Sequence, residues 1–309
     1  MMKLSRILFL SFIALIILLT LYGIYVYRGT VNAWSETYRE TGEIHREDII
    51  PETGENLTSI LLLIIDQEGL KGIEDMDDPG RADAVLLILL NKNSGKITAL
   101  SIPRDLRVEV SPEKSEKLTN TYVYGPEVTI RIVEDLLKFP VDHYIAFNYK
   151  AFADLVDAMG GIEIEPDESI ASRFESIEEG PQVLDGRLAQ FYVRFRSDHE
   201  GDFGRMRRQQ QVLDALIHQA VNPRSFIFVG RFFTIAKENM RHNIPIELIL
   251  ERELDVTSIS GDNFDKITLE GHGAIIDGIW YMLPDLISLY NIQNKLRSEL
   301  DSSKADTVR

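Results

Sequence analysis

The chain has 309 residues, of which 44% are hydrophobic and 27% are charged, a balance typical of globular proteins and unlike that of disordered or collagen-like chains. Its 49 acidic and 33 basic residues give a net charge of −16, which argues against a nucleic-acid-binding surface unless positive charge is concentrated locally. The absence of cysteine from the sequence excludes disulfides, thiolate zinc sites, iron–sulfur clusters and a cysteine nucleophile.

The N-terminal region predicts a membrane anchor. Residues 7–27 contain no charged side chain and would span about 31 Å as a helix, close to the thickness of a bilayer core. Lys3 and Arg6 favour a cytoplasmic N-terminus. The alternative is a cleavable signal peptide, but its apolar run is usually shorter and ends in small residues, whereas this one ends in tyrosines. We therefore expect a single-pass membrane protein whose acidic part lies outside the cytoplasm.

The rest of the chain divides into three parts. Residues 29–57 are polar and predict an extracytoplasmic linker after the anchor at 1–28. Residues 58–290 hold the apolar runs expected of a folded catalytic domain, and residues 291–309 predict the end of a C-terminal helix followed by a frayed polar tail.

Three short apolar runs predict strands that are covered on both faces, at Ile60–Ile65, Ala84–Leu90 and Ile97–Ile102. The hexapeptide at 91–96 is rich in turn residues and too short for a crossover, so the second and third strands should form an antiparallel hairpin. We therefore expect an α/β fold, a layered α-β-α domain with a central mixed, partly antiparallel sheet, preceded by one transmembrane helix.

Charged residues stand where these strands would meet at one edge. If the first strand runs antiparallel to the second, its end carries Asp66, the start of the second carries Asp83, and the end of the third leads to Arg104 and Asp105. Carboxylates suit Mg²⁺, which takes one or two of them together with waters and substrate phosphate oxygens. Exposed or arginine-paired carboxylates are the alternative, and position alone favours that alternative.

Positive charge is concentrated at residues 187–208, which hold six arginines and three acids. The segment 191–196 alternates between aromatic or aliphatic and polar residues, which predicts a strand with Arg194 and Arg196 on one face.

A helix is predicted over about 203–221. Arg205, Arg208 and Gln209 share its face toward the apolar residues, whereas Arg207 falls off that face. Guanidinium groups on this helix and on the preceding segment match the oxygens of a pyrophosphate. Ion pairing with the acidic surplus explains them equally well, and the stretch carries no nucleic-acid-binding motif.

The remaining apolar segments predict further core elements. These are a strand at Tyr144–Asn148, a helix ended by Gly160 and Gly161, a strand at Ile162–Ile164, and apolar helices at about 225–241 and 283–297. The apolar helices either line a groove for a lipid chain or pack as an ordinary core.

Taken in order, four motifs of the chain resemble the LytR-CpsA-Psr family of envelope proteins. They are Arg-Ala-Asp at 81–83, Ser-Ile-Pro-Arg-Asp at 101–105, Lys-Leu-Thr-Asn-Thr-Tyr-Val-Tyr-Gly at 117–125, and the arginine-rich motif at 192–211. The resemblance covers about 58–290 together with the N-terminal anchor. It implies an enzyme that transfers a glycopolymer, such as teichoic acid or a capsular polymer, from a polyprenyl-pyrophosphate carrier to a peptidoglycan hydroxyl.

The resemblance also implies roles for individual residues. It implies Mg²⁺, or Mn²⁺ in its place, at Asp66 and Asp83, and places Asp105 where it orients Arg104. The groups that it implies around the pyrophosphate are Arg104, Arg194, Arg196, Arg205, Arg208 and Gln209. It further implies an apolar tunnel for the prenyl chain.

The chain departs from the usual family pattern at four positions, which are Ile64, Ile65, Ala82 and Thr119. The expected carboxylates and arginines are present, so the chemistry should be kept, whereas the bulkier isoleucines put substrate preference and rate in doubt. Two alternative functions remain open at this point, a hydrolase that uses water as acceptor at the same site and a non-catalytic regulator of the envelope.

Overall fold

The computed structural model describes residues 28–29, 31–41, 53–54, 56–67, 80–166, 168–171, 176–195, 202–220, 239–246, 248 and 263–305. Its centre is a six-stranded sheet of order β10-β3-β2-β1-β6-β9. The strands are β1 (Leu57–Ile65), β2 (Ala82–Asn91), β3 (Lys96–Ile102), β6 (His143–Asn148), β9 (Met240–His242) and β10 (Phe264–Thr268). β2 pairs antiparallel with both β1 and β3, whereas β1 pairs parallel with β6 and β10 parallel with β3. The predicted mixed sheet and its hairpin are confirmed.

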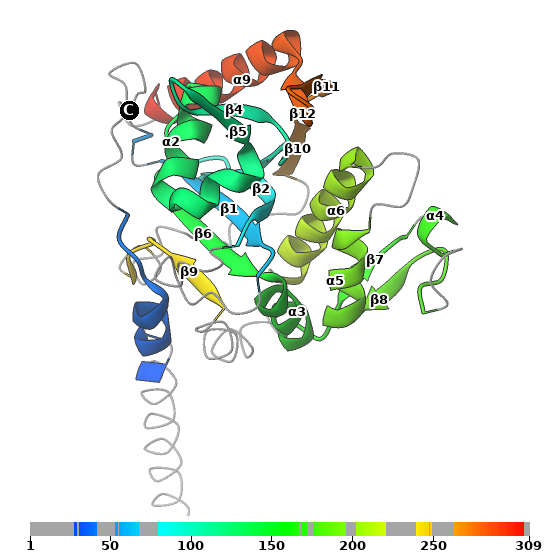
Figure 1. The fold of residues 1–309 in the computed structure, drawn as a ribbon. Coiled ribbons are helices and arrows are strands. Elements are labelled where there is room, and N and C mark those ends of the chain that lie inside the picture. The colour runs from blue at the N-terminus through cyan, green and yellow to red at the C-terminus, as the bar shows by residue number, and fades with distance from the viewer. Residues whose placement is uncertain are drawn as a thin grey trace, which may run out of the picture.

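Helices cover both faces of this sheet (Figure 1). One face packs against η1 (Leu118–Tyr124), α2 (Pro126–Leu137), α9 (Leu286–Ala305) and the hairpin of β4 (Arg107–Ser111) and β5 (Lys114–Lys117). The other face packs against α3 (Tyr149–Ala158), α5 (Gly186–Arg194), α6 (Asp202–Ala220) and the pair β7 (Ile162–Ile164) and β8 (Gln182–Leu184), near which lies α4 (Glu168–Ala171). Successive strand residues point to opposite faces, so the central strands are continuously apolar, as predicted.

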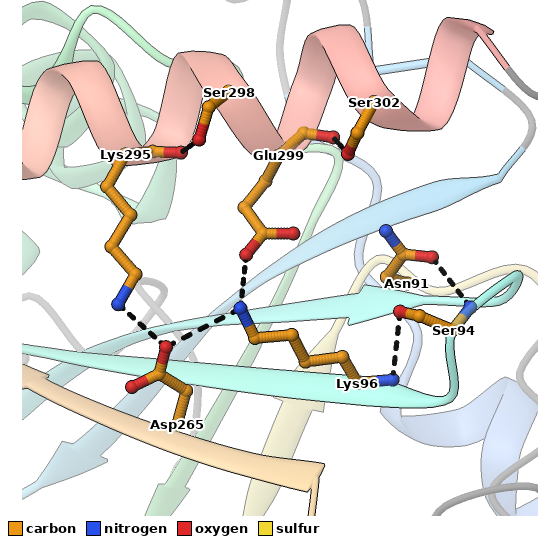
Figure 2. A network of polar contacts seen from close by, with 8 residues as sticks. All are labelled: Asn91, Ser94, Lys96, Asp265, Lys295, Ser298, Glu299 and Ser302. Carbon is orange, nitrogen blue, oxygen red and sulfur yellow. Dashed lines mark hydrogen bonds and ion pairs between the residues drawn. The ribbon is translucent and has the colours of Figure 1, made fainter.

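α9 is tied to the sheet by an ionic network (Figure 2). Lys96 Nζ lies 2.5 Å from Glu299 Oε1 and 3.5 Å from Asp265 Oδ2, which Lys295 Nζ also contacts at 2.6 Å. The hydrogen bond to Glu299 raises the pKa of Lys96. Burial raises the pKa of Asp265, but the Lys295 and Lys96 ammonium groups together lower it by more than burial raises it. The net shift of this pKa is therefore downward. The charged forms of Lys96 and Asp265 are therefore stabilised by their partners.

The C-terminal helix differs from its prediction in position and length. It begins at Leu286 and continues to Ala305, because β12 (Ile279–Pro284) occupies the residues before it. Residues after Leu300 were expected to form a frayed tail, yet Ser303 is buried, and Leu300 packs into the core. The polar residues near this end therefore remain helical through 305.

The predicted strand at 191–196 is wrong, because α5 extends to Arg194. Asp185 caps this helix by accepting a hydrogen bond of 2.7 Å from Leu188 N. Its buried residues Ala189, Tyr192 and Val193 follow helical spacing. The apparent alternation was misleading because Phe191, one of its apolar positions, is 50% exposed.

Two further predictions fall wholly or partly outside the described residues. The transmembrane segment at 7–27 lies outside them, and no helix in the described part of the chain is both long and apolar enough to cross a bilayer. Residues 225–238 of the predicted apolar helix at 225–241 also lie outside them. The end of that prediction is wrong, because Met240–His242 form β9, the edge strand beside β6.

Residues 31–41, within the predicted linker, pack against β9. They form a helix at 31–37, in which Trp34 Nε1 donates to Ile244 O at 3.0 Å and Thr37 Oγ1 hydrogen-bonds His242 Nε2 at 2.9 Å. Arg39 N donates to His242 O at 2.7 Å. His242 is fully buried, and burial lowers its pKa to about 4. The contact between this segment and the domain therefore depends on a neutral histidine.

The contact should weaken in acid. The unfolded pKa of a histidine is about 6.5 and the folded pKa of His242 is about 4, so the detached state binds more protons between these values and stability falls as pH falls. We expect the free energy of holding residues 31–41 in place to drop by about 2 kcal/mol between pH 6.5 and 4.5. Hydrogen exchange at the Arg39 amide, corrected for intrinsic rates, measures this. A His242→Gln variant with the same pH dependence would contradict the assignment.

Candidate functional site

A β-bulge lies at the predicted site. Ile64 pairs with Ala84, whereas Ile65 pairs with Ala82, which leaves Asp83 as the extra residue of β2. Ala82 packs into the core on the face covered by α2, the face to which regular alternation would direct Asp83. Asp83 is only 6% exposed. The bulge therefore removes this carboxylate from the alternation of side chains along β2 and places it at the edge of the sheet where the strands end.

Asp83 contacts a guanidinium and a phenol at this edge. Its Oδ1 forms an ion pair with Arg104 Nη1, and its Oδ2 accepts a hydrogen bond of 3.3 Å from Tyr149 Oη. Burial raises the pKa of Tyr149, and the negative charge of Asp83 raises it further. The phenol therefore keeps its proton and remains a donor. Asp83 and Arg104 were predicted to converge, and the structure brings them together.

Tyr149 was not predicted as a site residue. β6 runs parallel to β1 with Asn148 opposite Ile65, so the residues that follow the two strands, Tyr149 and Asp66, leave the sheet side by side. The sequence showed only that Tyr149 is the first residue after a predicted strand. Without knowledge that β6 neighbours β1, nothing marked Tyr149 as different from other core aromatics.

Asp66 lies on the exposed side of the same cluster. Its Oδ1 is 3.3 Å from Arg194 Nη2, with both side chains about half exposed, at 50% and 48%. The guanidinium carbon of Arg194 lies 4.5 Å from the centre of the Tyr149 ring, within cation–π range. Arg194 comes from the last turn of α5 rather than from a strand, and Arg196 lies outside the described residues. Tyr149 thus connects the two predicted metal carboxylates.

The segment that carries Arg104 and Asp105 is held from both sides. Thr119 N donates to Arg104 O at 2.8 Å from η1, and Met282 N donates to Asp105 O at 2.9 Å from β12. The Asp105 carboxylate lies 3.5 Å from Arg104 Nε and 2.9 Å from Lys117 Nζ. Asp105 therefore contacts two cations, and it contacts a different nitrogen of Arg104 from the one that pairs with Asp83. Lys117 is a second residue that the sequence analysis did not single out for the site.

The predicted helical face of α6 is buried. Arg205 is 1% exposed, Arg208 0% and Gln209 6%, whereas Arg207 is exposed, as the helical spacing indicated. Arg208 Nη2 donates to Phe195 O at 2.7 Å, and its guanidinium carbon lies 5.2 Å from the Phe195 ring centre. Gln209 Nε2 is buried and has no hydrogen-bond acceptor in the part of the chain that the structure describes. Its amide therefore has unused hydrogen-bonding capacity within those residues.

Gln210 fixes α6 against the sheet. Its Nε2 donates to Ser101 Oγ at 3.0 Å, Ile267 O at 2.8 Å and Thr268 Oγ1 at 3.1 Å. These acceptors lie at the ends of β3 and β10, the same edge that carries Arg104. This side chain thus helps to position the helix that supplies Arg205 and Arg208.

The donor set at this edge matches a particular kind of metal site. No group of three or more histidines, aspartates and glutamates able to hold a metal occurs within the described ranges, so a cage built wholly from these side chains is not found there. Mg²⁺ usually takes only one or two protein carboxylates and completes its octahedron with waters and phosphate oxygens. Asp66 and Asp83 fit that pattern.

Three of the four departures from the family pattern are core residues. Ile64 and Ile65 belong to the hydrophobic clusters on opposite faces of the sheet, and Ala82 joins the cluster of Ile65. Thr119 is also buried, and it contacts the site through its backbone N–H to Arg104. The two isoleucines therefore contribute to packing on both sides of the site edge.

Known proteins share both the sequence pattern and the fold. A sequence model of the LytR_cpsA_psr family matches residues 24–298. The polyisoprenyl-teichoic acid–peptidoglycan teichoic acid transferase TagU of Bacillus cereus (strain AH820) is 31% identical over 295 residues, which cover 91% of this chain and 93% of that protein. These matches confirm the family predicted from the four motifs.

Solved structures support the same fold. TagT bound to LI-WTA has a TM-score of 0.70 at 24% identity, over 86% of this chain and 99% of that one. YwtF (TagT), described as a LytR-CPS2A-psr family protein with bound octaprenyl pyrophosphate lipid, has a TM-score of 0.66 at 23% identity, over 86% and 99% of the two chains. At these identities the likeness establishes the shared α/β architecture.

Substitutions of Asp83 and Arg104 should have strongly non-additive effects on stability. Because Asp83 is buried, Asp83→Asn and Arg104→Gln should each lower the free energy of unfolding by about 2 kcal/mol, and the double variant should lose at least about 1 kcal/mol less than their sum. Chemical denaturation of the four proteins measures this. The exposed ion pair of Lys150 and Asp154 in α3, 2.6 Å apart, is the control, with an expected coupling of about 0.4 kcal/mol. Equal coupling in both pairs would contradict a buried, structurally important contact.

Proposed function

The chain belongs to the LytR-CpsA-Psr family, and from that premise we propose that it transfers a glycopolymer from a polyprenyl-pyrophosphate carrier to peptidoglycan. The observation that carries this proposal is the edge at which Asp66, Asp83, Arg104 and Arg194 meet around Tyr149. Support comes from the relative named as a teichoic acid transferase and from the TagT structure with bound octaprenyl pyrophosphate lipid.

The arginines supply the charge that a pyrophosphate needs. Guanidinium groups bind phosphate oxygens through paired hydrogen bonds and remain charged when buried. Arg104 and Arg194 contact the pyrophosphate from the edge of the sheet, and Arg196 joins them by family resemblance. The buried face of α6 adds Arg205, Arg208 and the amide of Gln209. Asp105 positions Arg104, to which its carboxylate lies close.

The reaction is a phosphoryl transfer in which positioning and charge neutralisation dominate. The oxygen of an acceptor hydroxyl attacks the sugar-linked phosphorus and forms a new P–O bond as the hydroxyl proton departs. The bond from that phosphorus to the bridging oxygen breaks, and polyprenyl phosphate leaves with the electron pair. The product is a phosphodiester between the polymer and peptidoglycan.

Asp66 and Asp83 would hold Mg²⁺, or Mn²⁺ in its place. Each carboxylate oxygen has two lone pairs, so Asp83 can accept from Arg104 and Tyr149 and still face a cation. The ion would supply neutralisation of negative charge on the pyrophosphate. Asp83 and Asp66 also orient the two arginines toward the pyrophosphate, because Arg104 and Arg194 each pair with one of these carboxylates.

The proposal includes the place of action. The polyprenyl carrier is a membrane lipid and peptidoglycan lies outside the membrane, so the catalytic domain is extracytoplasmic and residues 7–27 anchor it as a single span with a cytoplasmic N-terminus. Partly buried apolar residues of β1, β2 and α6, among them Leu62, Ile88 and Leu213, offer a wall for the prenyl chain.

Arg104→Ala should reduce transfer by about 100-fold or more, because a preorganised charge at the reacting phosphate is lost. The measurement uses purified full-length protein, a lipid-linked polymer donor and peptidoglycan, with circular dichroism to verify the fold. Arg207→Ala is the matched control, because Arg207 lies on the same basic segment but is exposed, and it should keep wild-type activity. Full transfer by the Arg104 variant would refute the proposed role.

Product analysis in the same assay separates the alternatives. Wall-linked polymer identifies a transferase, whereas free polymer released at the same rate without acceptor identifies a hydrolase. Absence of both products from an intact donor would favour a non-catalytic role. The proposal requires wall-linked polymer as the main product.

Transfer should depend on a divalent cation that Asp83 helps to hold. Chelation with EDTA should abolish activity, Mg²⁺ or Mn²⁺ should restore it, and Asp83→Ala should raise the Mg²⁺ concentration for half-maximal activity by about tenfold, since one of two carboxylate ligands is removed. Asp154→Ala, which removes a partly exposed carboxylate of α3, serves as the control. Unchanged Mg²⁺ dependence in the Asp83 variant would show that Asp83 does not hold the cation.

A further inference from the structure

A partly exposed tryptophan stands beside the segment that carries Arg104 and Asp105. Trp280 lies on β12 and is 46% exposed, whereas the other tryptophan, Trp34, is 6% exposed. β12 pairs with β11 (Gly271–Ile276) in a hairpin, and its Met282 N–H donates to Asp105 O at 2.9 Å. The indole therefore belongs to an element that is hydrogen-bonded directly to the candidate site.

The indole is held in place although almost half of it faces solvent. It lies over Gly273 on the neighbouring strand, where an added Cβ would come within 2.8 Å of Trp280 Nε1 and 3.1 Å of Cε2. No positive φ requires glycine at this position. A side chain at residue 273 would therefore crowd the indole. The packing against Gly273 thus limits the orientations of the indole, whose remaining surface is exposed on the hairpin.

Lys117 connects this aromatic surface to the site. Its Nζ lies 5.5 Å from the centre of the Trp280 ring and 2.9 Å from Asp105 Oδ1. Asp105 in turn contacts Arg104 Nε at 3.5 Å. A continuous series of contacts therefore runs from the exposed indole through the ammonium group of Lys117 and the carboxylate of Asp105 to the guanidinium of Arg104.

Resting on the proposed function, we infer that Trp280 and Lys117 form the subsite for the acceptor saccharide. A pyranose ring has an apolar face of C–H groups that stacks on an aromatic ring, while its hydroxyls require hydrogen-bonding groups around them. Trp280 supplies the stacking surface, and the Lys117 ammonium supplies donors for the hydroxyls. A sugar stacked there has the Arg104–Asp105 segment at its side, where an acceptor hydroxyl must enter.

The location favours the acceptor over the donor. The buried arginines of α6 belong to the face of the sheet that α3 and α5 cover, whereas β12 packs beside β4 near the opposite face. The β11–β12 hairpin also lies at the far end of the molecule from the helix at 31–37 (Figure 1). A lipid-linked donor and a glycan acceptor can thus approach the edge from different sides.

Intrinsic fluorescence provides a direct test of binding. The chain has two tryptophans, and only Trp280 is substantially exposed among them. Titration of the full-length protein with soluble peptidoglycan oligosaccharides should give a saturable change in emission. The change should persist in Trp34→Phe and disappear in Trp280→Phe. A wild-type protein without any saturable response would overturn the inference.

Transfer kinetics test the role of the subsite. Trp280→Ala should raise the KM for the acceptor by about tenfold, while the KM for the donor and kcat stay within about twofold of wild type. Trp280→Phe should retain part of the affinity, and Gly273→Ala should lose part of it by displacing the indole. Ile279→Ala is the control, since Ile279 is 50% exposed on the same hairpin but on the opposite face from Trp280.

The outcomes are distinguishable from a failure of the proposed function. If the wild-type protein shows no transfer, the proposed function fails, but the fluorescence titration still reports whether Trp280 binds a glycan. If transfer occurs and Trp280→Ala leaves the acceptor KM unchanged, the subsite is refuted alone. A rise in donor KM instead would assign the surface to the lipid-linked substrate and also refute the inference.

Discussion

The ion pair of the buried Asp83 with the partly buried Arg104 is the interaction on which the arrangement of the site depends. A carboxylate with 6% exposure is tolerated in an apolar strand only because a cation and a hydrogen-bond donor satisfy it. The β-bulge at Asp83 makes this possible, since it removes the carboxylate from the core-facing repeat. Arg104, Tyr149 and, through Tyr149, Arg194 and Asp66 are placed relative to this one group.

The surroundings of the pair are rigid on several sides. The Arg104–Asp105 segment is hydrogen-bonded to η1 and to β12, and Gln210 attaches α6 to the ends of β3 and β10. Under the proposed function such support is an advantage, because the groups of the site would not need to reorganise on binding a pyrophosphate. This also explains why neutral residues such as Gln210 and Gly273 matter to a site made of charges.

The two sides of the sheet edge differ in chemistry. On the α6 side the groups are buried guanidiniums and an amide, which suit a pyrophosphate. On the β12 side they are an exposed indole and an ammonium, which suit a saccharide. Residues 31–41 pack against β9. This packing holds the N-terminal segment of the described chain at the opposite end of the molecule from the β11–β12 hairpin (Figure 1).

Local patterns in the sequence were sufficient for several conclusions. Continuous apolar runs predicted β1, β2 and β3, a six-residue turn predicted their hairpin, and helical spacing placed Arg205, Arg208 and Gln209 on the buried face of α6. Each of these depends on residues close together in the chain. The strand predicted at 191–196 was wrong because period-two alternation over six residues also fits a short amphipathic helix, and Asp185, which caps α5, stood outside that window.

Contacts between distant segments could not be derived in this way. Tyr149 reaches Asp83 from 66 residues away, and Trp280 lies beside Lys117 although 163 residues separate them. The first contact requires the register of β1 with β6, and the second requires the pairing of β12 with the segment at 105–106. No local pattern encodes either. Local residue patterns thus predicted three strands, their hairpin and a charged edge, and four motifs predicted the family, whereas the long-range packing selected which aromatic and basic side chains join that edge.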